Sequence, residues 1–367
     1  MSVHDQGWFA AHHPEMGAVA LSDHPLPQLL GRGTLMLEFS LMRGEQDIVP
    51  LLHHATRNGW QRFLSVSFTH DGHLCVSQRQ GEAFHALSID ASDEIAAGGR
   101  MRLTWSWDAP ARTSLLTLEA LDNSSIRQRL GHAPLPLARE DAEALTSNTD
   151  AARIGPRVEW LALSDRVHPV GPGACFAPAT LIDTPTGPRP AASLRAGDLV
   201  ETVDGGAQPV VWSGRVSLPA LGSLCPVRLC APSFGATRDL WLMPEHRVAV
   251  GGPMVDYLFD KDEVLVPARY LVDGCTALQP DRPAVLGWHG ILLAQHHLLI
   301  SDGCLIESLA IGALARHSSL AAHTALADLA KAGKLPTHPR RARPVLKSYE
   351  AMTLAAARAQ KRGPVAA

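Results

Sequence analysis

The chain has 367 residues, of which 46% are hydrophobic and 19% are charged, and its formal net charge is −3 at pH 7. This length allows two or three domains of ordinary size, each with enough apolar side chains to bury a core. The slightly negative charge excludes a general nucleic-acid binder. The sequence contains no run of about 18 apolar residues, so we expect no membrane span.

Residues 1–30 are rich in His, Pro and Gly and follow no sustained hydrophobic period. This pattern predicts an irregular N-terminal arm. The segment has neither the basic stretch nor the apolar stretch that opens a conventional signal peptide, so we expect no such signal here.

Residues 31–165 alternate apolar and polar side chains in segments of strand length. Asp71-Gly72 predicts a hairpin turn inside one of them. The spacing predicts a β-sandwich with Trp105, Trp107 and Trp160 in its core, rather than on a sugar-stacking surface. The segments are Gly33–Leu41, Arg62–Gln78, Arg100–Asp108, Thr113–Leu121 and Arg157–Asp165.

This strand rhythm weakly resembles the concanavalin-like jelly rolls of lectins and laminin-G modules, and that resemblance implies a fold alone. A carbohydrate enzyme centred on residues 31–165 is a further hypothesis. The region has no carboxylate pair to support it.

A Pro- and Gly-rich stretch, residues 166–174, predicts a linker. Shorter strands with closer turns continue over residues 175–309, including a hairpin at Asp204-Gly205-Gly206. Residues 310–367 are Ala-rich and predict a helical basic tail, with a solvated face at Arg340–Arg343. The expected fold is therefore mainly β, a sandwich followed by a second all-β domain and a helical tail.

The chain has six cysteines, and no two of them have the CxxC spacing of a zinc site. A disulfide framework is not expected in so long a chain with large cores. We therefore expect reduced thiols and no metal. Cys175 stands at the first residue of the second domain, where it is either a structural cysteine or a chemically special one.

The segment that begins at Cys175, CFAPATLIDTPTGPRPAASLRAGDLVETVDG, resembles the opening of Hint domains. Inteins, the autoprocessing part of Hedgehog proteins and a set of bacterial proteins share these domains. The matching positions are Cys175, Phe176, Pro178, Thr180, Ile182, Gly187, Leu194, Gly197, Asp198 and Val200. Ala179 replaces a usual glycine, and Asp198 is expected to stabilise a turn.

A second block, LWLMPEHRVAV, resembles the T/S-P-x-H block of the same family, with Pro244 and His246 in place. Met243 stands where a hydroxyl residue is usual. Residues 262–274 and 296–309 resemble later family segments in order and spacing, and the tail resembles a segment that often follows bacterial Hint domains.

The resemblance implies a single-turnover reaction in cis. The Cys175 thiol attacks the carbonyl carbon of Ala174, which converts the peptide bond into a thioester by an N-to-S acyl shift. His246 assists as the proton donor to the leaving nitrogen. The substrate is the chain's own N-terminal segment, and no cofactor is implied.

The later segments decide the fate of the thioester. Glu307 and Ser308 occupy the positions of the intein His-Asn pair, so ordinary splicing is not expected. Water or an external nucleophile is the acyl acceptor. His296 is the third catalytic candidate, with His297 and Asp302 as further candidates. The two histidines either activate water or are polar residues at a strand start.

The alternative is a catalytically silent Hint scaffold in which the sandwich is a binding or adhesion module and Met243 marks lost chemistry. A thioether donates no hydrogen bond, so Met243 cannot replace a hydroxyl that polarises the scissile bond. The sequence leaves two localisations open, the bacterial cytoplasm and secretion without a conventional signal peptide.

Overall fold

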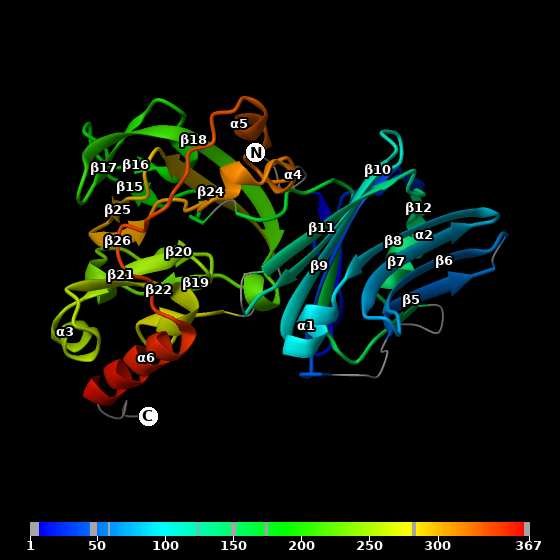
Figure 1. The fold of residues 1–367 in the computed structure, drawn as a ribbon, viewed down its shortest axis with the longest axis horizontal. Coiled ribbons are helices and arrows are strands. Elements are labelled where there is room, and N and C mark those ends of the chain that lie inside the picture. The colour runs from blue at the N-terminus through cyan, green and yellow to red at the C-terminus, as the bar shows by residue number, and fades with distance from the viewer. Residues whose placement is uncertain are drawn as a thin grey trace. The chain divides into compact units, whose positions relative to one another are not determined.

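The computed structural model describes residues 7–44, 50–57, 59–122, 125–147, 152–172, 175–280 and 284–362. The chain folds into two compact units, with the division between His168 and Pro169. Both units are built mainly from strands (Figure 1).

The first unit is a β-sandwich of a seven-stranded and a five-stranded antiparallel sheet. The seven strands, in sheet order, are β11 (Ser125–His132), β10 (Thr113–Ala120), β9 (Gly99–Asp108), β4 (Arg32–Leu41), β14 (Val158–Ser164), β1 (Trp8–His13) and β2 (Gly17–Ala20). The five strands are β13 (Ala152–Ile154), β5 (Pro50–Thr56), β6 (Arg62–Phe68), β7 (His73–Gln80) and β8 (Ala83–Asp90). A small pair joins β12 (Leu137–Ala138) to β3 (Leu29–Leu30).

Both sheets contribute to one apolar core. In β6, for example, Leu64, Val66 and Phe68 are buried, while the residues between them are half-buried. This period of two is the physical basis of the sandwich, because alternate side chains point to opposite faces of a strand. Trp105 and Trp107 are fully buried, stack at 4.7 Å between ring centroids and belong to this core, as predicted.

The first residues depart from the expected irregular arm. Residues 8–13 and 17–20 form β1 and β2, and β1 pairs with β14 in the large sheet. Trp8, Phe9 and Ala11 are buried in β1. Burial of these apolar side chains in the sandwich stabilises β1, although the sequence of the segment shows only a weak strand pattern.

Two short helices complete the unit, α1 (Ser92–Ala97) and α2 (Arg139–Leu145). Asp141 of α2 is buried and accepts two hydrogen bonds from the Arg62 guanidinium, from Nε at 2.7 Å and from Nη2 at 3.1 Å. The imidazole of His54 lies 3.0 Å from the same carboxylate. Glu140 contacts the same arginine, but 60% of its side chain is exposed.

This network predicts that Asp141→Ala destabilises the sandwich by about 3–5 kcal/mol, because it leaves the buried Arg62 without its bidentate partner. Glu140→Ala is the matched control and should cost less than about 1 kcal/mol, since its pair with Arg62 is open to solvent. Urea unfolding of the full chain, with hydrogen exchange at the β5–β7 amides, measures both values. Equal losses in the two variants would contradict the assignment.

The second unit is also mainly β. Its seven-stranded sheet runs β22 (Glu263–Pro267), β21 (Arg247–Gly251), β26 (Cys304–Glu307), β25 (Leu298–Ser301), β17 (Leu199–Thr202), β18 (Gly206–Pro219) and β24 (Val285–Leu293). A three-stranded sheet holds β20 (Leu240–Leu242), β19 (Val227–Leu229) and β23 (Ala277–Leu278), and a hairpin joins β15 (Leu181–Ile182) to β16 (Arg189–Pro190). Single 3-10 turns are η2 (Ala191–Ser193), η3 (Gly222–Leu224), η4 (Ser233–Gly235), η5 (Ala268–Leu271) and η6 (Leu314–Arg316).

The strand order of the large sheet brings the ends of three strands together. β21 pairs with β26, and β26 pairs with β25 in a hairpin whose turn holds Asp302. The start of β21, the start of β25 and the end of β26 therefore lie at the same end of three adjacent antiparallel strands.

The helices of this unit are α3 (Pro253–Phe259), α4 (Ser318–Ala321), α5 (Ala327–Lys331) and α6 (Ser348–Arg362). α6 packs against α3 and η5, and the red and yellow-green helices lie together in Figure 1. The tail is thus helical at 318–321, 327–331 and 348–362, and the residues between α5 and α6 follow an extended path. No helix in the described ranges is long and apolar enough to cross a membrane.

Candidate functional site

The backbone of Cys175 is held between β20 and β24. The N–H groups of Cys175 and Phe176 both donate to the carbonyl oxygen of His289, each at 2.9 Å. The carbonyl of Cys175 accepts from the N–H of Met243 at 3.1 Å, and Phe176 bridges to Leu242. Ala174, the expected scissile residue, lies outside the described residues.

The Cys175 thiol is half-buried and packs against the apolar core of the unit. Burial raises the pKa of this thiol far above its ordinary range, the Glu307 carboxylate adds to the rise, and Arg247 opposes it. The thiol is therefore protonated at neutral pH. All six cysteines of the chain are free thiols.

His246 lies in the short connection after β20 and directly precedes β21. Its side chain is buried, and the edge of the ring meets Phe176 at 4.7 Å between centroids. Neither ring nitrogen has a hydrogen-bond partner among the described residues. Burial lowers the pKa of His246 to about 4, Glu307 opposes the fall, and Arg247 and His296 add to it. His246 is therefore a neutral imidazole at pH 7, with one nitrogen that accepts a proton and one that donates.

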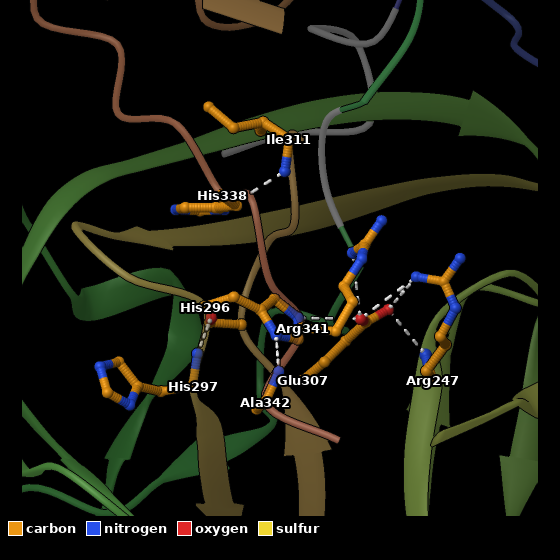
Figure 2. Close-up of polar contacts among 9 residues, drawn as sticks. Arg247, His296, His297, Glu307, Ile311, His338, Arg341 and Ala342 are labelled. Atoms are coloured by element: carbon orange, nitrogen blue, oxygen red, sulfur yellow. Dashed lines mark hydrogen bonds and ion pairs between the residues drawn. The ribbon is translucent and has the colours of Figure 1, made fainter. Parts of the chain in front are cut away.

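Glu307 ends β26 and is the carboxylate between these groups. Arg247 donates to Glu307 from Nη1 to Oε1 at 3.0 Å and from its backbone N–H at 3.2 Å. His296 Nε2 lies 3.0 Å from Oε2, and Arg341 Nη1 lies 3.7 Å from the same oxygen. Figure 2 shows the carboxylate between Arg247 on one side and His296 and Arg341 on the other.

These contacts keep the buried Glu307 ionised. Burial alone raises the pKa of Glu307, but the hydrogen bond with His296 and the charge of Arg247 outweigh it and lower the pKa to about 2. A carboxylate so deeply buried is stable only because it is paired and hydrogen-bonded.

The other predicted candidates lie in different places. Both ring nitrogens of His296 are engaged, since Nδ1 accepts from the backbone N–H of Ala342 at 2.9 Å. The ring of His297 points away from Glu307 (Figure 2). Asp302 sits in the turn at the far end of the β25–β26 hairpin, where its carbonyl accepts from Thr237. The structure thus groups His246, His296 and Glu307 near Cys175, but not His297 or Asp302.

The sequence analysis did not single out Glu307, Arg247 or Arg341 as site residues. A charged residue inside the apolar run CLIESLA was the available signal, because a carboxylate there must be buried and paired. The arginines that pair with it come from distant positions. Among the described residues, no group of three or more His, Cys, Asp or Glu side chains is arranged to hold a metal ion.

Comparison with known families assigns the second unit. The Hint domain family matches residues 174–313. Residues 174–313 are therefore a Hint domain, which follows the β-sandwich. The matched range includes Cys175, His246, His296 and Glu307, and it ends before Arg341 and Ala342. No curated protein matches the chain.

Solved structures similar to this chain are distant. A carbohydrate-binding module of the Ruminococcus gnavus IT-sialidase, bound to α2,6-sialyllactose, is 14% identical over 36% of this chain and 76% of its own, with a TM-score of 0.25. The Bacillus licheniformis β-glucanase is 12% identical over 38% and 69%, with a TM-score of 0.23. The mouse laminin α1 LG4-5 domains are 10% identical over 83% and 75%, with a TM-score of 0.22. Likenesses of this size carry no ligand or activity over to this chain.

The site predicts how the second unit responds to acid. Glu307 has a pKa of about 2 in the folded chain and an ordinary value of 4.5. Its stabilising contribution is therefore complete above pH 4.5 and is lost as the pH falls from 4.5 towards 2. The loss amounts to about 3 kcal/mol.

Urea unfolding at a series of pH values between 5 and 2.5 tests this. Glu307→Gln should lower the free energy of unfolding of the second unit at pH 5. It should also flatten the acid limb, by which we mean the fall of that free energy as the pH decreases from 5 to 2.5. Glu245→Gln should leave that limb unchanged, because 57% of the Glu245 side chain is exposed. An acid limb equally steep in Glu307→Gln would show that the carboxyl is not ionised in the fold.

Proposed function

We propose that this chain cleaves itself between Ala174 and Cys175 through a thioester. The observation that supports the proposal is a group of three side chains near the start of the Hint domain: a thiol, a neutral histidine whose ring nitrogens have no hydrogen-bond partner among the described residues, and a buried carboxylate. The proposal places the product boundary between the sandwich with its linker, residues 1–174, and the Hint domain with its tail, residues 175–367.

The first step forms one bond and breaks one. The Cys175 sulfur attacks the Ala174 carbonyl carbon, and the bond from that carbon to the Cys175 nitrogen breaks. The thiol proton passes to a nitrogen of the neutral His246, and the imidazolium returns a proton to the leaving nitrogen. A protonated thiol and a neutral imidazole are the states that this relay needs at its start.

The Glu307 carboxylate has a definite electrostatic role in this step. Its negative charge raises the pKa of both Cys175 and His246. It therefore disfavours a free thiolate and favours positive charge on His246 and on the amine that Cys175 acquires after the shift. An amine that becomes protonated cannot reattack the thioester, so the carboxylate draws the equilibrium towards the thioester.

The carbonyl of His289 supports the same step. It accepts hydrogen bonds from the N–H groups of Cys175 and Phe176 before the reaction. Once the Cys175 nitrogen becomes an amine, this carbonyl remains an acceptor for it. The backbone on the C-terminal side of the scissile bond is thus held while the acyl group moves.

The second step releases the acyl group. Glu307 and Ser308 stand where splicing inteins carry a histidine and an asparagine, so no side chain is available to cyclise. We therefore assign the release to water or an external nucleophile, which gives an Ala174 carboxyl group or its conjugate and a free Cys175 thiol. In this scheme His296 positions Glu307, because both of its ring nitrogens are engaged.

The cleavage is tested by following the mass of the purified full-length chain over hours, with and without hydroxylamine. Fragments 1–174 and 175–367 should form, and hydroxylamine should accelerate their release and leave a hydroxamate on Ala174, as a thioester requires. Cys175→Ala should abolish both, and Cys230→Ala should not. His246→Gln should slow cleavage about 10²- to 10⁴-fold. An intact chain under both conditions would refute self-cleavage and support the silent scaffold.

The side chain at position 243 provides a further test. Met243 offers no hydroxyl, although its backbone N–H contacts the Cys175 carbonyl at 3.1 Å. Met243→Thr should accelerate cleavage by about 100-fold, since one added donor at a developing oxyanion has roughly that effect. Met243→Val matches threonine in shape and lacks the hydroxyl, so it should not accelerate cleavage. Equal rates in the two variants would exclude a role for the hydroxyl.

A further inference from the structure

The residues between α5 and α6 include a segment that crosses the candidate site, His338–Leu346, which we call the strap. The strap begins at a buried histidine. The His338 N–H donates to the carbonyl of Gly312 at 3.0 Å, and its Nε2 lies 3.1 Å from the carbonyl of Leu293. Its Nδ1 accepts from the N–H of Ile311 at 3.4 Å. Two backbone segments of the Hint unit, at Leu293 and at Ile311–Gly312, thus hold the start of the strap.

The far end of the strap joins the edge of the large sheet. Leu265 of β22 donates its N–H to Pro344 at 2.8 Å and accepts from the N–H of Leu346 at 3.0 Å. Arg343 donates to Glu263 at 2.8 Å and forms two hydrogen bonds with Asp204, at 2.7 and 2.9 Å. The expected solvated face at Arg340–Arg343 is therefore wrong for Arg343, which is paired on both sides.

Between these anchors the strap contacts the site itself. The Ala342 N–H donates to His296 Nδ1 at 2.9 Å, and Arg341 lies 3.7 Å from the Glu307 carboxylate. Figure 2 shows both contacts, with the strap passing above the ends of the strands. The Arg341 side chain is 34% exposed and its ion pair is long, so the Ala342 contact is the stronger of the two.

The Ala342 contact fixes the tautomer of His296. A backbone amide can only donate, so the Nδ1 that faces it carries a lone pair and no proton. The ring proton therefore lies on Nε2, which donates it to Glu307 Oε2 at 3.0 Å. The opposite tautomer would set a lone pair against the carboxylate and an N–H against an N–H. One hydrogen bond from the strap thus orients the donor that Glu307 needs.

We propose that the strap is a positioning element of the cleavage site, acting mainly through the Ala342 N–H on His296 and through His296 on Glu307, and more weakly through the direct ion pair of Arg341 with Glu307. The proposal rests on the proposed self-cleavage. It extends the functional unit beyond residue 313, where the family match ends, and it makes the tail part of the reaction rather than an appendage.

The tautomer is tested first, in the full chain carrying Cys175→Ala so that no cleavage intervenes. Ala342→Pro removes the amide proton, and Ala342→Gly keeps it. Long-range proton–nitrogen NMR spectra of the histidines, with His296→Gln to assign the signals, report which ring nitrogen is protonated. His296 should be a pure Nε2–H tautomer in the parent and in Ala342→Gly. In Ala342→Pro the chemical shift of His296 Nδ1 should change, because this nitrogen loses its hydrogen-bond donor. Unchanged His296 signals in Ala342→Pro would overturn the proposal.

Cleavage is tested second, in the chain with Cys175 intact. Ala342→Pro should cleave about three- to tenfold more slowly than Ala342→Gly, the effect of one hydrogen bond. Equal rates would overturn the proposal, provided that melting curves show both variants folded.

A second variant pair keeps the test informative if Ala342→Pro does not fold. Arg341→Gln should slow cleavage relative to Arg341→Lys, which keeps the charge, and equal rates would count against the proposal. If the parent chain does not cleave at all, the proposed function fails while the NMR result still decides whether the strap sets the His296 tautomer.

Discussion

The candidate site depends on one buried negative charge. Glu307 is ionised inside the Hint domain because Arg247 and His296 hold its two oxygens. Burial sets the resting state of the neighbouring groups, a protonated Cys175 and a neutral His246, while the charge of Glu307 adds to the rise in the pKa of Cys175 and opposes the fall in the pKa of His246. The site is therefore not a preformed thiolate–imidazolium pair. The proposed acyl shift requires that positive charge develop as the acyl group moves, and in that proposal the carboxylate stabilises the charge.

Several parts of the fold serve this one carboxylate. The antiparallel order β21–β26–β25 brings Arg247 to the same end of the sheet as Glu307 and His296, although Arg247 is distant from both in sequence. The hydrogen bonds of Cys175 and Phe176 to His289 hold the backbone of Cys175 independently of that group. The first set of contacts controls charge and the second controls position, so a substitution in one need not disturb the other.

The features that the sequence predicted correctly are those encoded by patterns among neighbouring residues. The alternating strands around Asp71-Gly72 and Asp204-Gly205-Gly206 are present as the β6–β7 and β17–β18 hairpins. The Hint blocks identified Cys175 and His246 because their neighbours follow a family pattern. The strands in residues 8–20 were missed because they are short and because their stability comes from long-range contacts, the pairing of β1 with β14 and the burial of the β1 side chains. The arginine partners of Glu307 were missed because long-range ion pairs leave no local period in a sequence.

The arrangement of the sandwich gives the proposed cleavage a particular meaning. Every strand of its three sheets comes from residues before 165, and β1, the first strand, pairs with β14, the last. A break after residue 174 therefore pulls no strand out of any of those sheets. The proposed cleavage would therefore yield two folded products, the sandwich with a new carboxyl terminus and the Hint domain that has completed its single turnover, rather than one domain and a short peptide.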